Sequence, residues 1–251
     1  MSERKVVLIT GASRNLGAAI ARGCAKDGWN VAVHYRRARE QAETLTAGLR
    51  SQGTEAIAVQ ADLADDATSA QRVINEVVDH FGRLDGLVNN AADQTTAPLG
   101  DLTDDDWQRM LQANVIATTR LVRAALGALA PGGSVVNVSS VEASSAFPNH
   151  AHYAAAKAGL ESFTRSLALE LGPKGMRANA VAPGLIEREG LEAAWPEGHA
   201  WWSSVAPNGR PVTADEVAAA VAFLVGDQAS GINGVVLPVD GGWSASARTT
   251  F

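Results

Sequence analysis

Cysteine is almost absent from this chain. Cys24 is the only one in 251 residues, which excludes an intrachain disulfide and any metal site built from several cysteines. We therefore expect no metal centre and a reducing, cytoplasmic setting.

Positive charge and long apolar runs are scarce as well. The 21 Lys and Arg are outnumbered by 27 Asp and Glu, so the formal net charge is −6 and the pI is about 5.4. This balance gives no sign of the excess of basic residues that is typical of a nucleic-acid-binding protein. The apolar run Val6–Ile9 is too short for a signal-peptide core, and no run approaches the ~18 apolar residues of a membrane span. We expect neither nucleic acid nor a membrane as a partner.

Apolar residues are plentiful, at 46%, and gather in short runs that alternate with helical patterns. Seven runs are typical of strands: 6–9, 31–33, 56–59, 86–88, 134–138, 177–181 and 235–239. Helical patterns cover about 18–27, 38–51, 67–81, 104–129, 153–171 and 214–225. Apolar strands separated by helices predict an α/β fold with a parallel sheet covered on both faces. Without repeats or linkers, residues 1–251 are expected to form one domain.

The segment at about 185–211 breaks this alternation. It shows no clear pattern, yet it carries Trp195, Trp201 and Trp202, half of the six Trp in the chain. A loop this long inside a compact domain is usually functional, so we predict a substrate lid. The alternative is a loosely packed insertion or an oligomer contact.

Two side chains with proton chemistry lie four residues apart in an Ala-rich stretch. Tyr153 and Lys157 would share one face of a helix at that spacing. Lowering a Tyr pKa from near 10 to neutrality takes ~4 kcal/mol, about what a cation ~4 Å away provides, although partial burial works against it. The pair therefore predicts a general acid near pH 7. Taken alone, it fits a surface contact at least as well.

A Gly-rich turn follows the first predicted strand. The run from Gly11 to Gly17 leads into the first helical pattern. Small residues in that place let the backbone approach a pyrophosphate, which rests on the helix N-terminus. A Gly-rich turn alone is weak evidence, because any turn from a strand to a helix can need a glycine. The position of this turn after the first strand of the α/β alternation is what favours a dinucleotide site.

In combination these motifs resemble the short-chain dehydrogenase/reductase family, in its single-domain branch. The resemblance runs from Val6 to Gly242 and rests on the Gly-rich turn, Asp62-Leu63, Asn89-Asn90-Ala91-Ala92, Asn114, Ser140, Tyr153 with Lys157, and Pro183-Gly184. Within the family, the chain is similar to ketoreductases of the 3-oxoacyl-acyl-carrier-protein reductase type. The resemblance implies a Rossmann-type, doubly wound sheet of seven parallel strands with helices on both faces.

The resemblance also implies roles for particular residues. Ser140 would polarise a substrate carbonyl, and Tyr153 would pass a proton to or from its oxygen. Lys157 would lower the pKa of Tyr153 and hold the nicotinamide ribose, while Asn114 would anchor a water that relays protons. The implied cofactor-binding residues are Gly11, Arg14, Asn15, Leu16, Gly17, Tyr35, Arg36, Asp62, Leu63, Asn89, Ala91, Tyr153, Lys157, Pro183, Gly184 and Ile186.

The end of the second predicted strand bears on the choice of cofactor. By alignment with the family, Tyr35 occupies the place of an acidic residue that would bind a ribose 2′-hydroxyl, and Arg36 follows it. Arg36 and Arg14 converging on one point would suit a 2′-phosphate. We therefore expect NADP(H) to be preferred. NAD(H) is the alternative if these Arg side chains only face water.

The chain departs from the family pattern in several places. Asn15 replaces a Gly of the turn, although Asn tolerates positive φ better than most residues. Arg188 stands where a Thr is frequent, and Glu142 where relatives often have a small residue. The candidate substrate contacts are Glu142, His150, Trp195, Trp201 and Trp202. For Glu142 and His150, the alternative is that they point to water.

The predicted activity is NADPH-dependent reduction of a small ketone or aldehyde to an alcohol, in a reversible reaction. An NAD-dependent alcohol dehydrogenase is one alternative. A non-catalytic dinucleotide-binding sensor is another, and the retained Ser140, Tyr153 and Lys157 speak against it. A pteridine reductase is disfavoured, because those enzymes typically carry an Asp in place of Ser140. Since the family commonly forms tetramers through helices at about 104–129 and 153–171 and through the C-terminal segment, we expect a homotetramer.

Overall fold

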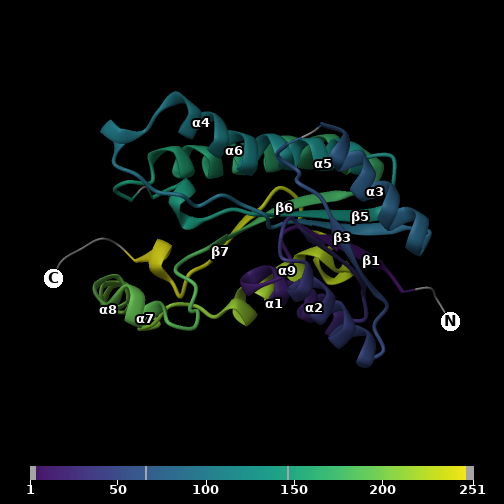
Figure 1. Ribbon diagram of the computed structural model, residues 1–251, viewed down its shortest axis with the longest axis horizontal. Helices are drawn as coiled ribbons and strands as arrows, with labels where there is room; N and C mark the ends of the chain where they lie inside the picture. Colours follow the sequence, from purple (N-terminus) through teal and green to yellow (C-terminus); the bar gives the residue numbers. More distant parts are fainter. Residues whose placement is uncertain (1–3, 66, 146, 247–251) are drawn as a thin grey trace.

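The computed structural model of the protein describes residues 4–65, 67–145 and 147–246. Seven parallel strands form one sheet in the order β3-β2-β1-β4-β5-β6-β7, which confirms the expected doubly wound, Rossmann-type fold (Figure 1). The strands are β1 (Val6–Ile9), β2 (Asn30–Tyr35), β3 (Ala56–Gln60), β4 (Leu84–Asn89), β5 (Leu129–Val138), β6 (Arg177–Pro183) and β7 (Val236–Val239). The strand order reverses between β1 and β4, where ligands of such sheets bind.

Helices cover both faces of the sheet (Figure 1). One face carries α1 (Asn15–Lys26), α2 (Arg39–Ser51) and α9 (Ala214–Val225). The other carries α3 (Ala67–Phe81), α4 (Asp104–Leu111), α5 (Ala117–Ala125) and α6 (Ala151–Leu171). None of these helices, within the described ranges, is long and apolar enough to cross a membrane.

The pleat of β1 shows why its sequence is apolar throughout. Val7 and Ile9 pack into the core beneath α1 and α9, whereas Val6 and Leu8 pack into the core beneath α3 and α5. Successive side chains of a strand point to opposite faces, so a strand with helices on both faces needs an apolar residue at every position. The four residues are at most 1% exposed.

The helix predicted at about 104–129 is wrong in extent and in regularity. It begins as predicted at Asp104, behind a capping box formed by Thr103 and Asp106, but a π-helical turn, η2 (Gln112–Ile116), separates α4 from α5. The helix ends at Ala125, just before a turn that contains Gly127, a poor helix former. Leu129 instead begins β5 and pairs with Leu84.

Residues 185–211 are also more regular than predicted. They contain α7 (Leu191–Ala194) and α8 (Pro196–Val205), the second starting at a proline, whose fixed φ suits the first helical position. Before α7, Ile186 forms an isolated bridge to Val212. These short helices lack the long apolar periodicity that identifies a helix from sequence.

Candidate active site

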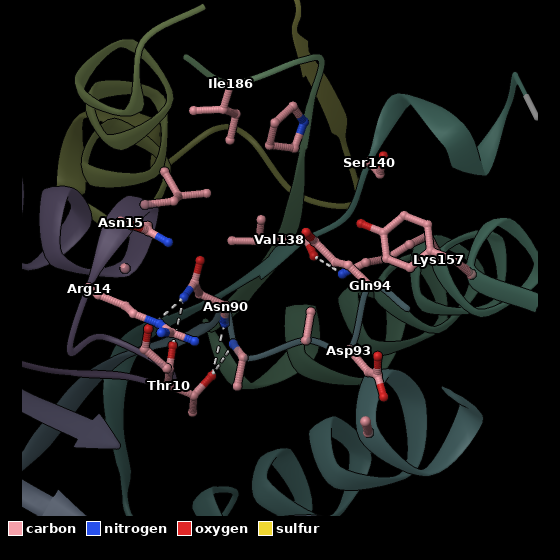
Figure 2. Close-up of a pocket in the computed structure, with 18 of the residues that line it drawn as sticks. Thr10, Arg14, Asn15, Asn90, Asp93, Gln94, Val138, Ser140, Lys157 and Ile186 are labelled. Atoms are coloured by element: carbon pink, nitrogen blue, oxygen red, sulfur yellow. Dashed lines mark hydrogen bonds between the residues drawn. The ribbon is translucent and has the colours of Figure 1, made fainter. Parts of the chain in front are cut away.

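A cleft of about 1890 Å³ runs along the carboxyl ends of the strands. It extends from Arg36 and Arg37, after β2, to Glu142 and Trp201 at the far end. Figure 2 shows Arg14 and Asn15 on one side and Ser140 and Lys157 on the other. Pockets for drug-sized ligands have volumes of roughly 300–1,000 Å³. This cleft is larger, so it has room for a dinucleotide and a second molecule.

Ser140 lies two residues after β5 and is buried. Its Oγ accepts a hydrogen bond of 3.2 Å from the backbone N–H of Glu142. That bond occupies an acceptor position of the hydroxyl and leaves its proton available. Ser140 can therefore donate a hydrogen bond to a ligand in the cleft.

Tyr153 and Lys157 lie on successive turns of α6, and both are buried at the wall of the cleft. The Lys157 Nζ donates a hydrogen bond of 2.8 Å to the carbonyl of Val138 and lies 5.6 Å from the centre of the Tyr153 ring. The sheet and the helix thus meet where Ser140 and Tyr153 face each other. The structure brings together these three predicted catalytic residues.

The protonation of this pair differs from the sequence prediction. Burial raises the pKa of Tyr153, and the Glu142 carboxylate raises it further, while hydrogen bonding with Ser140 and Gln94 lowers it. Burial lowers the pKa of Lys157 to about 8. The pKa of the phenol therefore shifts in the opposite direction from the one expected, because desolvation and the Glu142 carboxylate outweigh the two hydrogen bonds. The phenol is kept protonated, which is the form that can donate a proton.

Asn114 lies on the π-helical turn η2, behind the residues that line the cleft. Its Nδ2 donates to the carbonyls of Asp93 and Met110, at 3.0 Å each, whereas its buried Oδ1 has no partner among the described residues. Such bulges often occur at functional sites. An unpaired buried acceptor is the group to which a water would be expected to bind.

The Gly-rich turn is held in place by the residues after β4. Asn90 donates from Nδ2 to the carbonyls of Thr10 and Gly11, at 2.9 and 3.2 Å, and the Thr10 Oγ1 accepts from the N–H groups of Asn90 and Ala91. Asn15 has a φ of 48°, which an Asn can adopt. The structure thus adds Thr10 and Asn90, which the sequence analysis did not single out by role, as braces of this turn.

Gly17 allows the turn to pack closely. A Cβ at this position would lie 2.3 Å from the Gly11 carbonyl oxygen and 2.7 Å from the Asn90 Nδ2. Arg14, the residue before α1, makes no side-chain cap hydrogen bond. The first N–H groups of α1 therefore lack a side-chain acceptor from the cap residue and face the cleft, as a phosphate site requires.

The other end of the cleft corrects one predicted contact. Arg14, Arg36 and Arg37 line the cleft, and the Arg36 guanidinium lies 3.9 Å from the Asp62 carboxylate. Tyr35 does not line it; its side chain is buried in the core under α1 and α2. Alternation along β2 explains the difference, because His34 and Arg36 point to one face and Tyr35 to the other.

The remaining predicted cofactor contacts do line the cleft. They are Gly11, Asn15, Leu16, Gly17, Asp62, Leu63, Asn89, Ala91, Pro183, Gly184 and Ile186. They lie at the ends of β1, β3, β4 and β6 and at the start of α1. No group of His, Cys, Asp and Glu in the described part of the chain could hold a metal ion.

The far end of the cleft contains aromatic and ionisable side chains. Trp195 and Trp201 line it and are 48% and 43% exposed, whereas Trp202 is buried and stacks on Trp243 at 5.2 Å between ring centres. The His150 Nδ1 lies 2.6 Å from the Glu142 Oε2. All five predicted substrate contacts therefore border the same end. Gln94, which was not predicted, also lines it and helps to lower the pKa of the Tyr153 phenol.

Comparisons with known proteins agree with this geometry. A family model described as enoyl-(acyl carrier protein) reductase matches residues 11–244. An uncharacterized oxidoreductase of Methylorubrum extorquens is 37% identical over 96% of this chain and 98% of its own. The 3-oxoacyl-(acyl-carrier-protein) reductase of Staphylococcus aureus is 35% identical over 96% and 99%. A short-chain dehydrogenase of Burkholderia cenocepacia, solved with NADP, is 38% identical over 97% and 100%, with a TM-score of 0.89.

The fold, the position of the cleft and these similarities give one answer. The chain belongs to the short-chain dehydrogenase/reductase family, as an oxidoreductase that acts on CH–OH groups with a nicotinamide dinucleotide.

Proposed function

We propose that the protein reduces a ketone or aldehyde to an alcohol with NADPH, reversibly, using Tyr153 as the proton donor. The observation that carries this proposal is the convergence of Ser140, Tyr153 and Lys157 at one end of a cleft whose other end is a Gly-rich turn. Both the proton source and the cofactor cradle lie along the same strand ends. The retained proton donor speaks against a non-catalytic sensor.

The residues of the cleft fit a nicotinamide dinucleotide. The Gly-rich turn, which packs closely at Gly17, and the N-terminus of α1 border the cleft together. When bound, the nicotinamide supplies a hydride to the carbonyl carbon. The pyrophosphate would rest against Gly11 to Gly17, and the ribose near Tyr153 and Lys157. Asp62 and Asn89 line the part of the cleft where the adenosine would lie.

The side chains around the carbonyl would act on its oxygen. Ser140 donates a hydrogen bond to that oxygen, and Tyr153 donates the proton that completes the alcohol. The proton is then restored to the Tyr153 phenolate by way of Lys157 and a water held at the Asn114 Oδ1. The raised pKa of Tyr153 keeps the phenol protonated, which is the form that reduction needs, whereas oxidation of an alcohol starts from the phenolate.

The preference for NADP(H) rests on the arginines at the adenosine end. Arg14 precedes α1 and Arg36 follows β2, and both side chains line the cleft. No carboxylate replaces Tyr35 at the end of β2, where it would repel a 2′-phosphate. A relative solved with NADP is consistent with this preference. Arg37 lines the cleft beside Arg36 and would strengthen the cationic field.

We further propose that residues 185–211 close over the substrate as a lid of the single domain. Trp195 and Trp201 would shield the reacting carbonyl from water, since both line the cleft and remain partly exposed. A hydrogen bond of 3.0 Å between the His199 Nε2 and a Glu187 carboxylate oxygen ties α8 to the loop after β6. The buried, unpaired thiol of Cys24 suits a reducing compartment such as the cytoplasm.

The first experiment compares the wild type with Tyr153→Phe. NADPH oxidation is followed with a panel of ketones, and the substitution should lower kcat by roughly 10²–10⁴, because the general acid is lost. Phe keeps the ring and its packing, so folding should be unaffected. Equal rates for the two proteins would refute the proton-donor role, and no oxidation by the wild type with any ketone would refute the reductase itself.

The second experiment tests the cofactor preference. We expect kcat/KM with NADPH to exceed that with NADH, and Arg36→Ala to lower this ratio roughly tenfold or more, as the loss of a charge-assisted hydrogen bond to phosphate implies. Arg39→Ala is the matched control, because Arg39 lies on α2 but does not line the cleft. Similar kcat/KM values with the two cofactors in the wild type would contradict the assignment.

A further inference from the structure

The substrate end of the cleft holds a carboxylate–imidazole pair that the proton and hydride chemistry does not use. The Glu142 Oε2 and the His150 Nδ1 are 2.6 Å apart, and both side chains line the cleft. Glu142 lies on η3 (Val141–Ala143), directly after Ser140, and His150 is the residue before α6, three positions ahead of Tyr153. The pair therefore borders the site where the carbonyl would bind.

Hydrogen bonding within the pair leaves acceptors facing the cleft. In this short contact, the His150 tautomer with its proton on Nδ1 donates a hydrogen bond to the Glu142 Oε2. The second oxygen of Glu142, Oε1, has no hydrogen-bond partner in the part of the chain that the structure describes. A neutral His150 would present its Nε2 as a second acceptor. Its ring centre lies 6.3 Å from that of Tyr153.

Donors and acceptors thus lie side by side at this end of the cleft. Ser140 and Tyr153 donate to a carbonyl oxygen, whereas Glu142, bonded through its own N–H to the Ser140 Oγ at 3.2 Å, presents an acceptor next to them. A substrate that satisfies both needs an acceptor and a donor on neighbouring atoms. We propose that the substrate is a carbonyl compound with a hydroxyl group on the adjacent carbon, and that Glu142 with His150 binds this hydroxyl. The proposal rests on the proposed reductase function.

The charge of the surroundings supports a neutral hydroxyl rather than an acid. The loop after β6 brings Glu187 and Glu189 to the cleft, with Arg188 between them. Glu142 is only 16% exposed at its side chain, so its field is weakly screened by water. A carboxylate placed next to the carbonyl would meet Glu142 directly. The cleft therefore selects a hydroxy ketone over a keto acid of the same shape.

The test uses three aryl ketones that differ only beside the carbonyl: acetophenone, 2-hydroxyacetophenone and phenylglyoxylate. For each, kcat/KM is measured with NADPH in the wild type and in Glu142→Gln. The intrinsic reactivity of each ketone cancels in the comparison between proteins. The preference for 2-hydroxyacetophenone over acetophenone should fall roughly tenfold or more in the variant, as expected for a hydrogen bond to a charged group. The kcat/KM with phenylglyoxylate, relative to that with acetophenone, should rise in Glu142→Gln.

Opposite changes for two substrates separate recognition from damage to the fold, because damage would lower both. His150→Ala, which frees Glu142 from its partner, should lower the same preference. Glu76→Gln, at an exposed position of α3, is the matched control and should leave all three rates unchanged. Calorimetry with NADP⁺ and a ketone supplies a readout without turnover, because the carbonyl in the reacting position has no hydride to give. 2-Hydroxyacetophenone should bind more tightly than acetophenone to the wild type, and the two should bind equally tightly to Glu142→Gln.

Three outcomes would overturn the proposal. An unchanged preference in a folded Glu142→Gln would show that the pair does not recognise the hydroxyl. Faster turnover of phenylglyoxylate than of 2-hydroxyacetophenone by the wild type would show that an anion is preferred. If the wild type reduces other ketones of the panel but not 2-hydroxyacetophenone, this proposal fails, whereas the absence of NADPH oxidation with any ketone means that the reductase function fails first.

Discussion

At the scale of single residues, His34 connects the cofactor turn to the stability of the fold. Its ring is 2% exposed; its Nδ1 accepts from the Gly11 N–H at 3.2 Å, and its Nε2 lies 3.1 Å from the Ala61 carbonyl oxygen. Both contacts are satisfied by a neutral imidazole with its proton on Nε2. Burial lowers the pKa of His34 to about 4.

This shift predicts acid sensitivity. The unfolded chain binds a proton at His34 below about pH 6.5 and the folded chain only below about 4, so the free energy of unfolding decreases as the pH falls through that window. The loss is at most ~3 kcal/mol. Urea unfolding at pH 7 and pH 4.5 should show a smaller loss in His34→Asn, which keeps an acceptor. His80→Asn, at an exposed position, is the control, and parallel losses in all three proteins would contradict the prediction.

Residue-level predictions from sequence succeeded where position along the chain was enough. Ser140, Tyr153 and Lys157 meet at the cleft because they follow β5 and share one face of α6. Tyr35 was misplaced because family alignment, rather than strand alternation, decided its role. The direction of the Tyr153 pKa shift could not be derived from the spacing to Lys157, because it depends on burial and on Glu142, both set by the fold.

At the scale of elements, the Gly-rich turn and α1 depend on a close contact at Gly17. A Cβ there would lie 2.3 Å from the Gly11 carbonyl oxygen, which is backbone and cannot turn aside. We expect Gly17→Ala to lower the free energy of unfolding by about 1–3 kcal/mol, as overpacking does, and to weaken NADPH binding measured by fluorescence titration. Gly48→Ala on α2 is the matched control, because nothing lies within 4 Å of a Cβ added there. It should leave NADPH binding unchanged and raise the free energy of unfolding by about 0.5–1 kcal/mol. Equal NADPH affinity in all three proteins would argue against the tight turn.

Elements were predicted best where a clear apolar pattern ended at a recognisable break. The apolar runs identified all seven strands, and the moderate lengths of α2 and α3 were matched closely. The helix at 104–129 was overextended because its pattern continues past Gly127, and only the pairing of Leu129 with Leu84 shows where it must end. The π-helical turn at Asn114 was not predicted, because the sequence pattern at 104–129 was interpreted as a single regular helix.

At the scale of the whole molecule, the surface of α4, η2, α5 and α6 carries apolar side chains without a partner in the single chain. Leu169 is 80% exposed on α6, and Leu111 and Ile116 are 38% and 39% exposed. These helices are the ones through which a homotetramer was expected. Apolar side chains gathered on one layer of a protein commonly mark an interface. The homotetramer remains a proposal, and its site on the molecule is specific enough to test.

Sedimentation velocity should therefore give a species of about four times 26.1 kDa for the wild type. Leu169→Glu should shift the protein to smaller species, because a charge placed within an apolar contact loses its hydration without gaining a partner. Ala47→Glu adds the same charge at an exposed position of α2, on the opposite face of the sheet, and should leave the assembly intact. A wild-type monomer would refute the tetramer. A tetramer unchanged by Leu169→Glu would move the interface away from the end of α6.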